Sequence, residues 1–341
     1  MTGPPALRVG AGVATGVGSL PGEDPAVAVR AAFDDYPQLP YLPELPARGP
    51  GADMLGRAAG MLVDISVDLQ PSGWRLVGRP GIDERRARDL HSRDLEALGE
   101  HAPDYAGRLK LQIAGPYALA AGIELHRGDK AIADPGATRD IADSLAEGAA
   151  RYVASVRERL PRADVVVQLD EPSLPAVLAG RVPTASGYDV LPAIEESDAA
   201  ATMRRVMNRV RATPGVAGVA VHCCAAAAPI ALLRIAGADG LGLDAHLLTG
   251  MDDPLGEAIE ADMLLLLGVV SGAASELPEA PAVADSARLL WRRLGFDPVD
   301  LAGGVVLTPT CGHARSTPAY AAAAAGRLRA AGRLLVEEPE G

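Results

Sequence analysis

The sequence lacks the features that define several classes of protein. Its longest uninterrupted apolar stretch runs from Met263 to Val270, far short of the ~20 residues that a membrane-spanning helix needs. No basic segment followed by an apolar one is present near residue 1, so we expect no secretion signal and a cytoplasmic location. The formal net charge is −12 and no basic run occurs, which argues against nucleic acid or an anionic membrane as the main partner.

Cysteine is scarce. The 341 residues include only Cys223, Cys224 and Cys311, and an odd number of cysteines is a poor basis for a disulfide framework. In a reducing compartment such thiols stay free for metal binding or for chemistry.

The chain does contain short β-branched and aliphatic runs, most of them followed by a stretch that can form a helix. Seven such runs are predicted to be strands: 13–19, 109–115, 164–172, 218–224, 240–245, 264–272 and 304–312. An eighth strand is expected within 61–78, either as "MLVDISV" (61–67) or as "WRLVG" (74–78).

Strands that alternate with helices pair in parallel, and about eight such units fit a (β/α)8 TIM barrel. We therefore predict an α/β fold with a single barrel domain over residues 1–341, and a doubly wound sheet is the alternative. The Pro- and Gly-rich segments 37–51 and 271–282 are expected to be long loops over the active face.

The unusual polar residues fall at the carboxyl ends of the predicted strands, where barrel enzymes build their active sites. These residues are Ser19, Asp170, His222, Cys224, Asp244 and Cys311.

Side chains alternate along a strand, so His222 and Cys224 point to one side and Cys223 to the other. Barrel closure would bring Cys311 to the first two, and one imidazole with two thiolates is a ligand set that suits zinc. Taken singly, a free cysteine is more often a small buried apolar residue, and a strand-end histidine is often structural. The expected convergence of His222, Cys224 and Cys311 favours a metal site. Cys223, in contrast, is expected to pack beneath a helix.

Four motifs resemble the catalytic C-terminal domain of cobalamin-independent methionine synthase, within the uroporphyrinogen decarboxylase and methionine synthase-like group of barrels. "GVGSLPG" (16–22) is similar to the family's Ile-Gly-Ser-Phe-Pro segment, and "QLDEPSLP" (168–175) to its Gln-Ile-Asp-Glu-Pro-Ala-Leu. "HCC" (222–224) supplies a His-x-Cys pair, and "TPTCGHARS" (308–316) is similar to Asn-Pro-Asp-Cys-Gly. Their order and spacing also agree with the family.

The resemblance implies a zinc ion that binds the thiol of homocysteine as a thiolate. Its ligands in the family are His, Cys, Glu and Cys, which carry over to His222, Cys224 and Cys311, with Asp244 at the position of the glutamate. Because aspartate is shorter than glutamate, His246 and His313 are alternative fourth ligands.

The resemblance also assigns Asp170 to the ammonium group of homocysteine and Ser19 to its carboxylate. A carboxylate at a strand end can accept a charge-assisted hydrogen bond from an ammonium, although neighbouring backbone N–H groups could satisfy it instead. Glu171 points the other way and is expected to be structural, and Ser19 also fits ordinary turn and cap chemistry.

Three departures from the family pattern bear on the methyl donor. The chain is about the size of the catalytic barrel alone, so we expect a short form without the N-terminal domain that helps to bind folate polyglutamate. The family's Asp-x-His acid should fall in "GVVSGAASE" (268–276), which holds no histidine; His246 or His313 could replace it. The second substrate carboxylate, in a His-Gly-Glu motif of the family, has no clear counterpart, and Asp64 and Asp68 are only nearby.

We therefore predict a zinc-dependent methyltransferase that converts homocysteine to methionine, with a methyl-corrinoid or methyl-tetrahydrofolate as donor. One alternative is a zinc-dependent alkyltransferase acting on another small thiol, as in the epoxide-to-coenzyme-M transferases. A second alternative is a metal-free relative or binding protein whose cysteines are structural.

Overall fold

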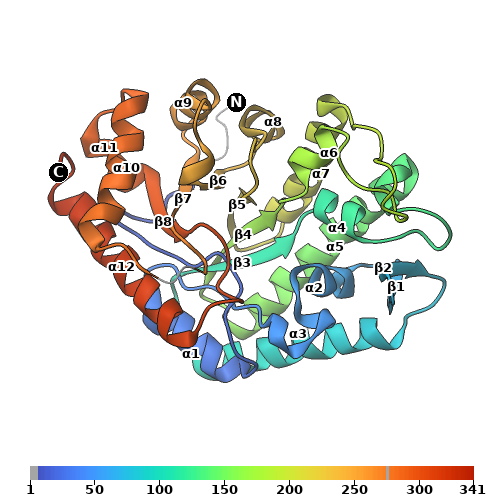
Figure 1. Cartoon of the computed structure of the whole chain (residues 1–341). Coiled ribbons are helices and arrows are strands. Elements are labelled where there is room, and N and C mark those ends of the chain that lie inside the picture. Colours follow the sequence, from blue (N-terminus) through green and yellow to red (C-terminus); the bar gives the residue numbers. More distant parts are fainter. Residues whose placement is uncertain (1–6, 274–275) are drawn as a thin grey trace.

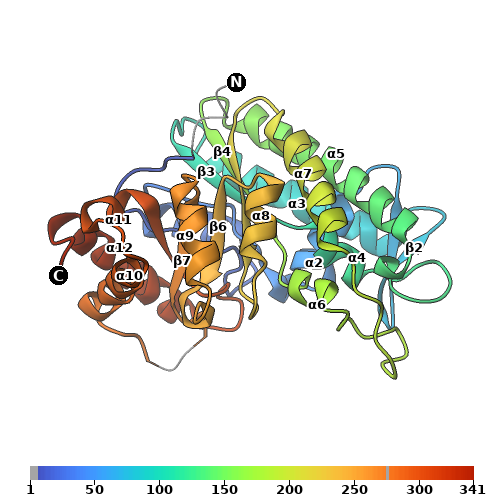
Figure 2. The same ribbon diagram turned by 90° about the horizontal axis from the view of Figure 1, so that it is seen from above.

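Six parallel strands form one curled sheet, and helices lie around its outer face (Figure 1, Figure 2). The computed structural model describes residues 7–273 and 276–341. Strand order follows the sequence, with helices between successive strands, as expected for repeated βα units. The strands are β3 (Arg108–Ala114), β4 (Asp164–Asp170), β5 (Val216–Cys223), β6 (Gly240–Asp244), β7 (Leu264–Val270) and β8 (Val305–Pro309).

Helices of the described part of the chain connect and cover these strands. The α-helices are α1 (Pro25–Asp35), α2 (Met54–Met61), α3 (Ile82–His101), α4 (Pro116–Gly122), α5 (Pro135–Arg159), α6 (Leu174–Leu178), α7 (Glu196–Arg211), α8 (Ile230–Ala236), α9 (Asp252–Glu260), α10 (Ala280–Leu294), α11 (Pro298–Gly304) and α12 (Pro318–Glu337). The short 3-10 helices are η1 (Pro46–Arg48), η2 (Pro50–Ala52), η3 (Ala131–Ala133) and η4 (Ala245–Leu247).

Several helices begin at a side chain that accepts hydrogen bonds from the first turn, often just before a proline, whose missing N–H costs nothing there. Asp24, Asp134 and Asp297 cap α1, α5 and α11 in this way. Thr317 does the same for α12. The local sequence thus sets where the chain turns away from each strand.

Both edges of the sheet continue into segments that are not regular strands. Beside β8, Ala14 forms a single parallel bridge to Leu307, and beside β3, Tyr41 forms one to Lys110. The predicted strand 13–19 is therefore reduced to isolated bridges. The two segments are in turn joined to each other by a bridge between residues 19 and 44.

The prediction that residues 61–78 supply a strand to the main sheet is wrong. These residues form a separate antiparallel hairpin of β1 (Ser66–Gln70) and β2 (Gly73–Val77). Only two residues separate β1 from β2. So short a connection allows antiparallel pairing, whereas parallel pairing needs a long crossover.

The α/β class and the parallel sheet are confirmed, and the other six predicted runs form the strands of that sheet. Six strands rather than eight form the regular ladder, so the architecture is a curled half-barrel sheet of the TIM-barrel type. The expected loop 37–51 lies partly inside the fold, since residues 39–45 are all buried.

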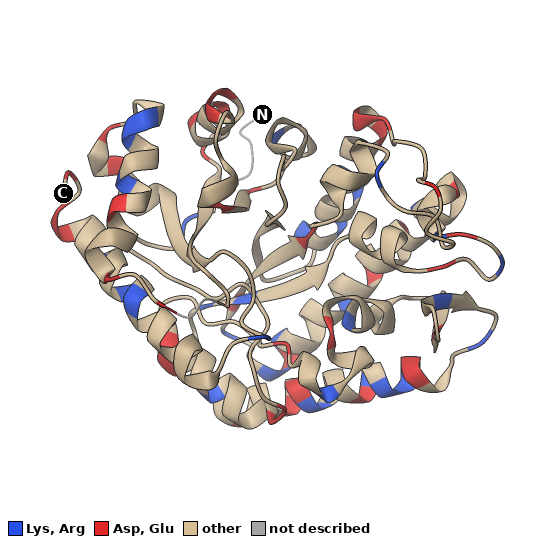
Figure 3. Cartoon of the chain, in the orientation of Figure 1, with Lys and Arg blue, Asp and Glu red and all other residues tan. Residues whose placement is uncertain are grey.

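Charged residues of both signs are interspersed on the outer helices, whereas the sheet carries few of them (Figure 3). Among the helices in the described ranges, none combines the length and the apolar character that crossing a membrane requires.

Close packing of α5 against the end of α2 generates a testable prediction. A Cβ at Gly148 in α5 would lie 2.1 Å from the carbonyl oxygen of Met61, whereas a Cβ at Gly326 in α12 would meet nothing within 4 Å. We expect Gly148→Ala to lower the free energy of unfolding by about 1–3 kcal/mol because the backbones must separate. Gly326→Ala should raise it by up to about 1 kcal/mol, since alanine favours the helix.

Urea unfolding of both variants measures this difference. Equal stabilisation by the two alanines would show that α5 and α2 are not in close backbone contact.

Candidate functional site

Asp170 and His222 form the buried centre of the site. Asp170 is the last residue of β4 and His222 the last but one of β5. The sheet register places them directly opposite each other, so their side chains share one side of the sheet. The Nδ1 of His222 lies 3.0 Å from Oδ1 of Asp170, and each residue is only 6% exposed. Gln168 donates a second hydrogen bond of 2.7 Å to the same oxygen.

Both expected cysteine ligands are brought together although they are 87 residues apart. Cys224 directly follows β5 and Cys311 lies two residues beyond β8, and their sulfur atoms are 3.9 Å apart. The hydrogen bond from Cys224 and the nearby His222 lower the pKa of Cys311 to about 6, against the opposing effect of burial. The same hydrogen bond and burial raise the pKa of Cys224.

Cys223 is buried in the apolar core, at 1% exposure. Burial raises the pKa of its thiol to about 11, so it stays protonated at neutral pH. This agrees with the expectation that Cys223 is a packing residue.

Asp244 and His246 interact with each other at the end of β6. Oδ1 of Asp244 accepts a 2.9 Å hydrogen bond from the backbone N–H of His246 and lies 2.9 Å from its Nδ1. The His246 side chain is 68% exposed. Asp244, the predicted fourth ligand, and His246, its predicted alternative, therefore contact each other at the start of η4.

Ser19 and His313 meet on the other side of the site. The backbone N–H of His313 donates to the carbonyl of Ser19 at 2.8 Å, and a Cβ at Gly312 would lie 2.1 Å from the Ser19 hydroxyl, so a larger residue there would displace that hydroxyl. His313 is buried, its Nδ1 is 2.9 Å from the carbonyl of Gly272, and its Nε2 has no partner among the described residues. It thus lies against Gly272, in the segment that follows β7.

Glu44 is a buried carboxylate that the sequence analysis did not identify. It is 5% exposed, and burial with the charge of nearby Asp170 raises its pKa to about 7, although Arg57, at 3.7 Å, opposes the shift. Asp64 and Asp68, the positions considered for a second carboxylate, lie just before and within the β1–β2 hairpin instead. The only signal for Glu44 is one acid inside the apolar run "YLPELP" (41–46).

Glu171 faces away from this centre, as expected. Its two carboxylate oxygens accept hydrogen bonds from the backbone N–H groups of Tyr117 and Ala118, at 2.9 and 2.8 Å, where α4 begins. Complete burial raises its pKa to about 8. Its role is to join β4 to α4.

No group of three His, Cys, Asp or Glu side chains in the part of the chain that the structure describes is arranged to hold a metal ion. Two of the donors do have the spacing of ligands, since two sulfurs on a tetrahedral zinc ion lie ~3.8 Å apart and those of Cys224 and Cys311 are 3.9 Å apart. A carboxylate on Nδ1, as at His222, is also typical of a histidine whose other ring nitrogen binds a metal. Cys224, Cys311 and His222 are therefore the residues whose chemistry suits zinc, and only the two sulfurs already have the spacing of ligands.

The fold and the site define an α/β protein with thiol, imidazole and carboxylate groups gathered at the carboxyl ends of parallel strands. A family model described as "Cobalamin-independent synthase, Catalytic domain" matches residues 13–333. The chain belongs to this family, a family of methyltransferases, which confirms the resemblance noted in the sequence.

Among solved structures, a B12-independent methionine synthase from Shewanella sp. W3-18-1, in complex with selenomethionine, is similar in fold. The TM-score is 0.63 at 13% sequence identity, over 96% of this chain and 98% of that one. A D-psicose 3-epimerase from Clostridium cellulolyticum H10, with D-tagatose, gives a TM-score of only 0.36 at 12% identity over 73% and 83% of the chains, too low to support an argument. No curated protein matches the chain.

Proposed function

We propose that this protein is a zinc-dependent methyltransferase that transfers a methyl group to the thiol of homocysteine, giving methionine. The observation that carries the proposal is the pair of thiols, Cys224 and Cys311, whose sulfurs are 3.9 Å apart next to the buried Asp170–His222 pair. Membership of a methionine synthase family makes homocysteine the expected acceptor.

His222, Cys224 and Cys311 are the proposed zinc ligands. Asp170 accepts a hydrogen bond from Nδ1 of His222, so Nε2 of His222 is left to bind the metal. Asp244 is the proposed fourth ligand, and reaching the metal would require its contact with His246 to open. Bound zinc would hold the homocysteine thiol as a thiolate, because coordination deprotonates a thiol.

The amino acid part of homocysteine is proposed to bind between Asp170, Ser19 and Glu44. Asp170 and Glu44 are close enough for their charges to interact, and both are buried, so an ammonium group placed between them would relieve their repulsion. The hydroxyl of Ser19 would serve the carboxylate group of the substrate. Glu44 thereby takes the part of the second substrate carboxylate.

We also propose that segments 13–19 and 40–44 occupy the places of the first two strands of a (β/α)8 barrel and that residues 1–341 form one domain. Backbone hydrogen bonds run from Leu307 to Val13, from Glu44 to Gly18 and from Lys110 to Pro40, and they support this ring. Such closure is what brings Cys311 round to Cys224.

Asp170→Asn tests the substrate assignment. Loss of one charge-assisted contact with the ammonium should weaken homocysteine binding about ten- to hundred-fold, measured by calorimetry on zinc-loaded protein. Asp164→Asn makes the same change at the exposed, opposite end of β4 and should leave binding unaltered. Equal binding by Asp170→Asn and the wild type would remove Asp170 from the substrate site.

The proposed methyl donor is a methyl-corrinoid rather than methyl-tetrahydrofolate. The leaving nitrogen of the folate must be protonated, and general acid catalysis is typically worth ~10²–10⁴ in rate. Segment 268–276 has no histidine to supply that proton; its residues 274 and 275 lie outside those described. Cobalt in a corrinoid leaves without protonation.

We expect zinc-loaded protein to form methionine faster from methylcobalamin, or from a methylated corrinoid protein, than from methyl-tetrahydrofolate polyglutamate. A side-by-side assay of methionine formation measures the ranking. The Cys224→Ser/Cys311→Ser double variant should be inactive with both donors, whereas Cys223→Ser should keep the wild-type rate.

The opposite ranking would contradict the donor proposal. His313→Gln and His246→Gln would then show which histidine supplies the proton, since His313 lies against Gly272. Absence of turnover with either donor, together with turnover of another small thiol, would contradict homocysteine as the acceptor.

A further inference from the structure

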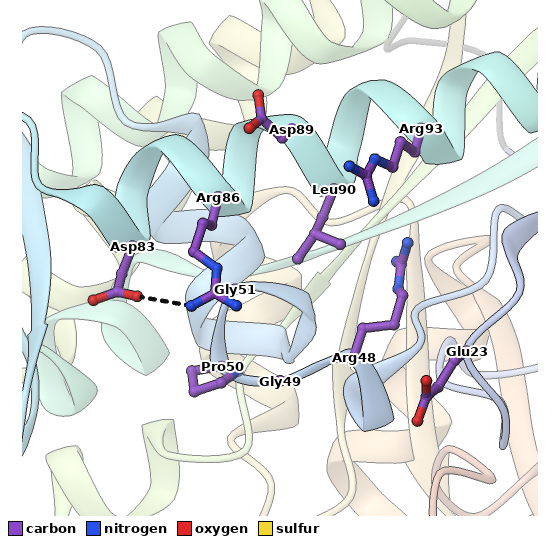
Figure 4. Close-up of a pocket in the computed structure, with 10 residues that line it drawn as sticks. All are labelled: Glu23, Arg48, Gly49, Pro50, Gly51, Asp83, Arg86, Asp89, Leu90 and Arg93. Carbon is purple, nitrogen blue, oxygen red and sulfur yellow. Dashed lines mark ion pairs between the residues drawn. The ribbon is translucent and has the colours of Figure 1, made fainter.

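A cavity lies outside the sheet, between η1–η2 and helix α3. Its volume is about 480 Å³, and three of its lining residues are the arginines Arg48, Arg86 and Arg93. Figure 4 shows the side chains of Arg48 and Arg93 pointing toward each other across the cavity, while the carboxylate of Asp89 points away from it. The size falls within the range of sites for small organic ligands.

Arg48 is held in place by a carboxylate that it shares with a second arginine. Its side chain is 8% exposed and pairs with Asp94 at 2.7 Å, and Asp94 also pairs with the buried Arg57. Asp94 thus bridges two guanidinium groups, of which Arg57 also pairs with Glu44 at 3.7 Å, and Nε of Arg48 has no hydrogen-bond partner in the described part of the chain. Arg48 therefore keeps one N–H donor without a partner among the described residues, although Glu23, Asp83 and Asp89 also line the cavity and balance its three arginines in number.

Arg93 faces this wall from the exposed side of α3. Across the described residues, no carboxylate lies within ion-pair distance of Arg93. Two guanidinium groups directed toward each other repel, and an anion between them would turn this repulsion into two charge-assisted contacts. This end of the cavity therefore suits a phosphate or carboxylate group.

Arg86 adds a second cationic position further along the same helix. It precedes Arg93 by seven residues, which is about two turns and roughly 10 Å along the axis. Its pair with Asp83, at 3.8 Å and with the arginine side chain 72% exposed, is of the weak surface kind. Arg86 is thus free to contact a second anionic group.

We propose that this arginine-lined cavity binds a small organic dianion whose two oxyanion groups, phosphates or carboxylates, are about 10 Å apart. One group contacts Arg48 and Arg93, and the other contacts Arg86. The site is separate from the proposed homocysteine site and does not depend on it. The buried pairs of Arg57 with Asp94 and with Glu44 connect the two places through the interior.

Titration calorimetry at low salt, with fructose 1,6-bisphosphate and with suberate as separate probes, tests the proposal. We expect one site per chain for at least one probe, and the probe that binds identifies phosphate or carboxylate as the preferred chemistry. Arg93→Ala and Arg86→Ala should each weaken binding about tenfold or more. These two side chains are on the surface, so the variants should fold, which their unfolding temperatures will check.

Arg85→Ala is the matched control, because Arg85 is an exposed arginine of α3 that hydrogen-bonds the carbonyl of Pro80 and does not line the cavity. It should change binding by less than about twofold. Binding of neither probe would overturn the proposal. Binding that is unchanged by Arg93→Ala, or reduced equally by Arg85→Ala, would do the same.

Discussion

The structure depends on how polar side chains inside the curled sheet satisfy the carbonyl groups of the irregular segments at its edges. Lys110 and Gln168 both donate to the carbonyl of Val17, at 2.8 and 3.0 Å. Gln112 donates to that of Leu42 at 2.7 Å. All three donors are buried, and leaving one of these carbonyls unpaired there would cost about 1–3 kcal/mol. The side chains thus replace the regular ladder that residues 13–19 and 40–44 do not form.

This constraint also assembles the site. Once the two segments are fixed, Ser19 and Glu44 lie next to each other and face the ends of the strands that present Asp170 and His222. Burial raises the pKa of Glu44 to about 7 and lowers that of Lys110 to about 8. Two buried ionisable side chains with shifted pKa values are typical of a binding site, and they suit a charged ligand such as an amino acid.

Much of this could be predicted from the sequence, and the failures have physical causes. Six buried parallel strands can be predicted because each aliphatic run ends near a small or polar residue and is followed by a stretch that can form a helix, and the approach of Cys311 to Cys224 is expected from barrel closure. Glu44 was missed because prolines flank it and its segment has no strand periodicity. The prediction of a main-sheet strand within 61–78 fails because the two-residue turn between β1 and β2 decides the pairing, and the hydrophobic pattern does not reveal that turn. The contact of Asp244 with His246 depends on the local geometry of the turn at η4, which the spacing of residues in the sequence does not predict.

The proposed function requires that the ligands of a zinc ion and the thiol of homocysteine meet at the carboxyl ends of the strands. Zinc X-ray absorption spectroscopy on the metal-loaded protein, before and after addition of homocysteine, tests it most directly. We expect two sulfur ligands at ~2.3 Å with nitrogen or oxygen completing the shell, and a third sulfur once homocysteine is added. An all-nitrogen-and-oxygen shell, or no gain of sulfur with homocysteine, would rule out this arrangement.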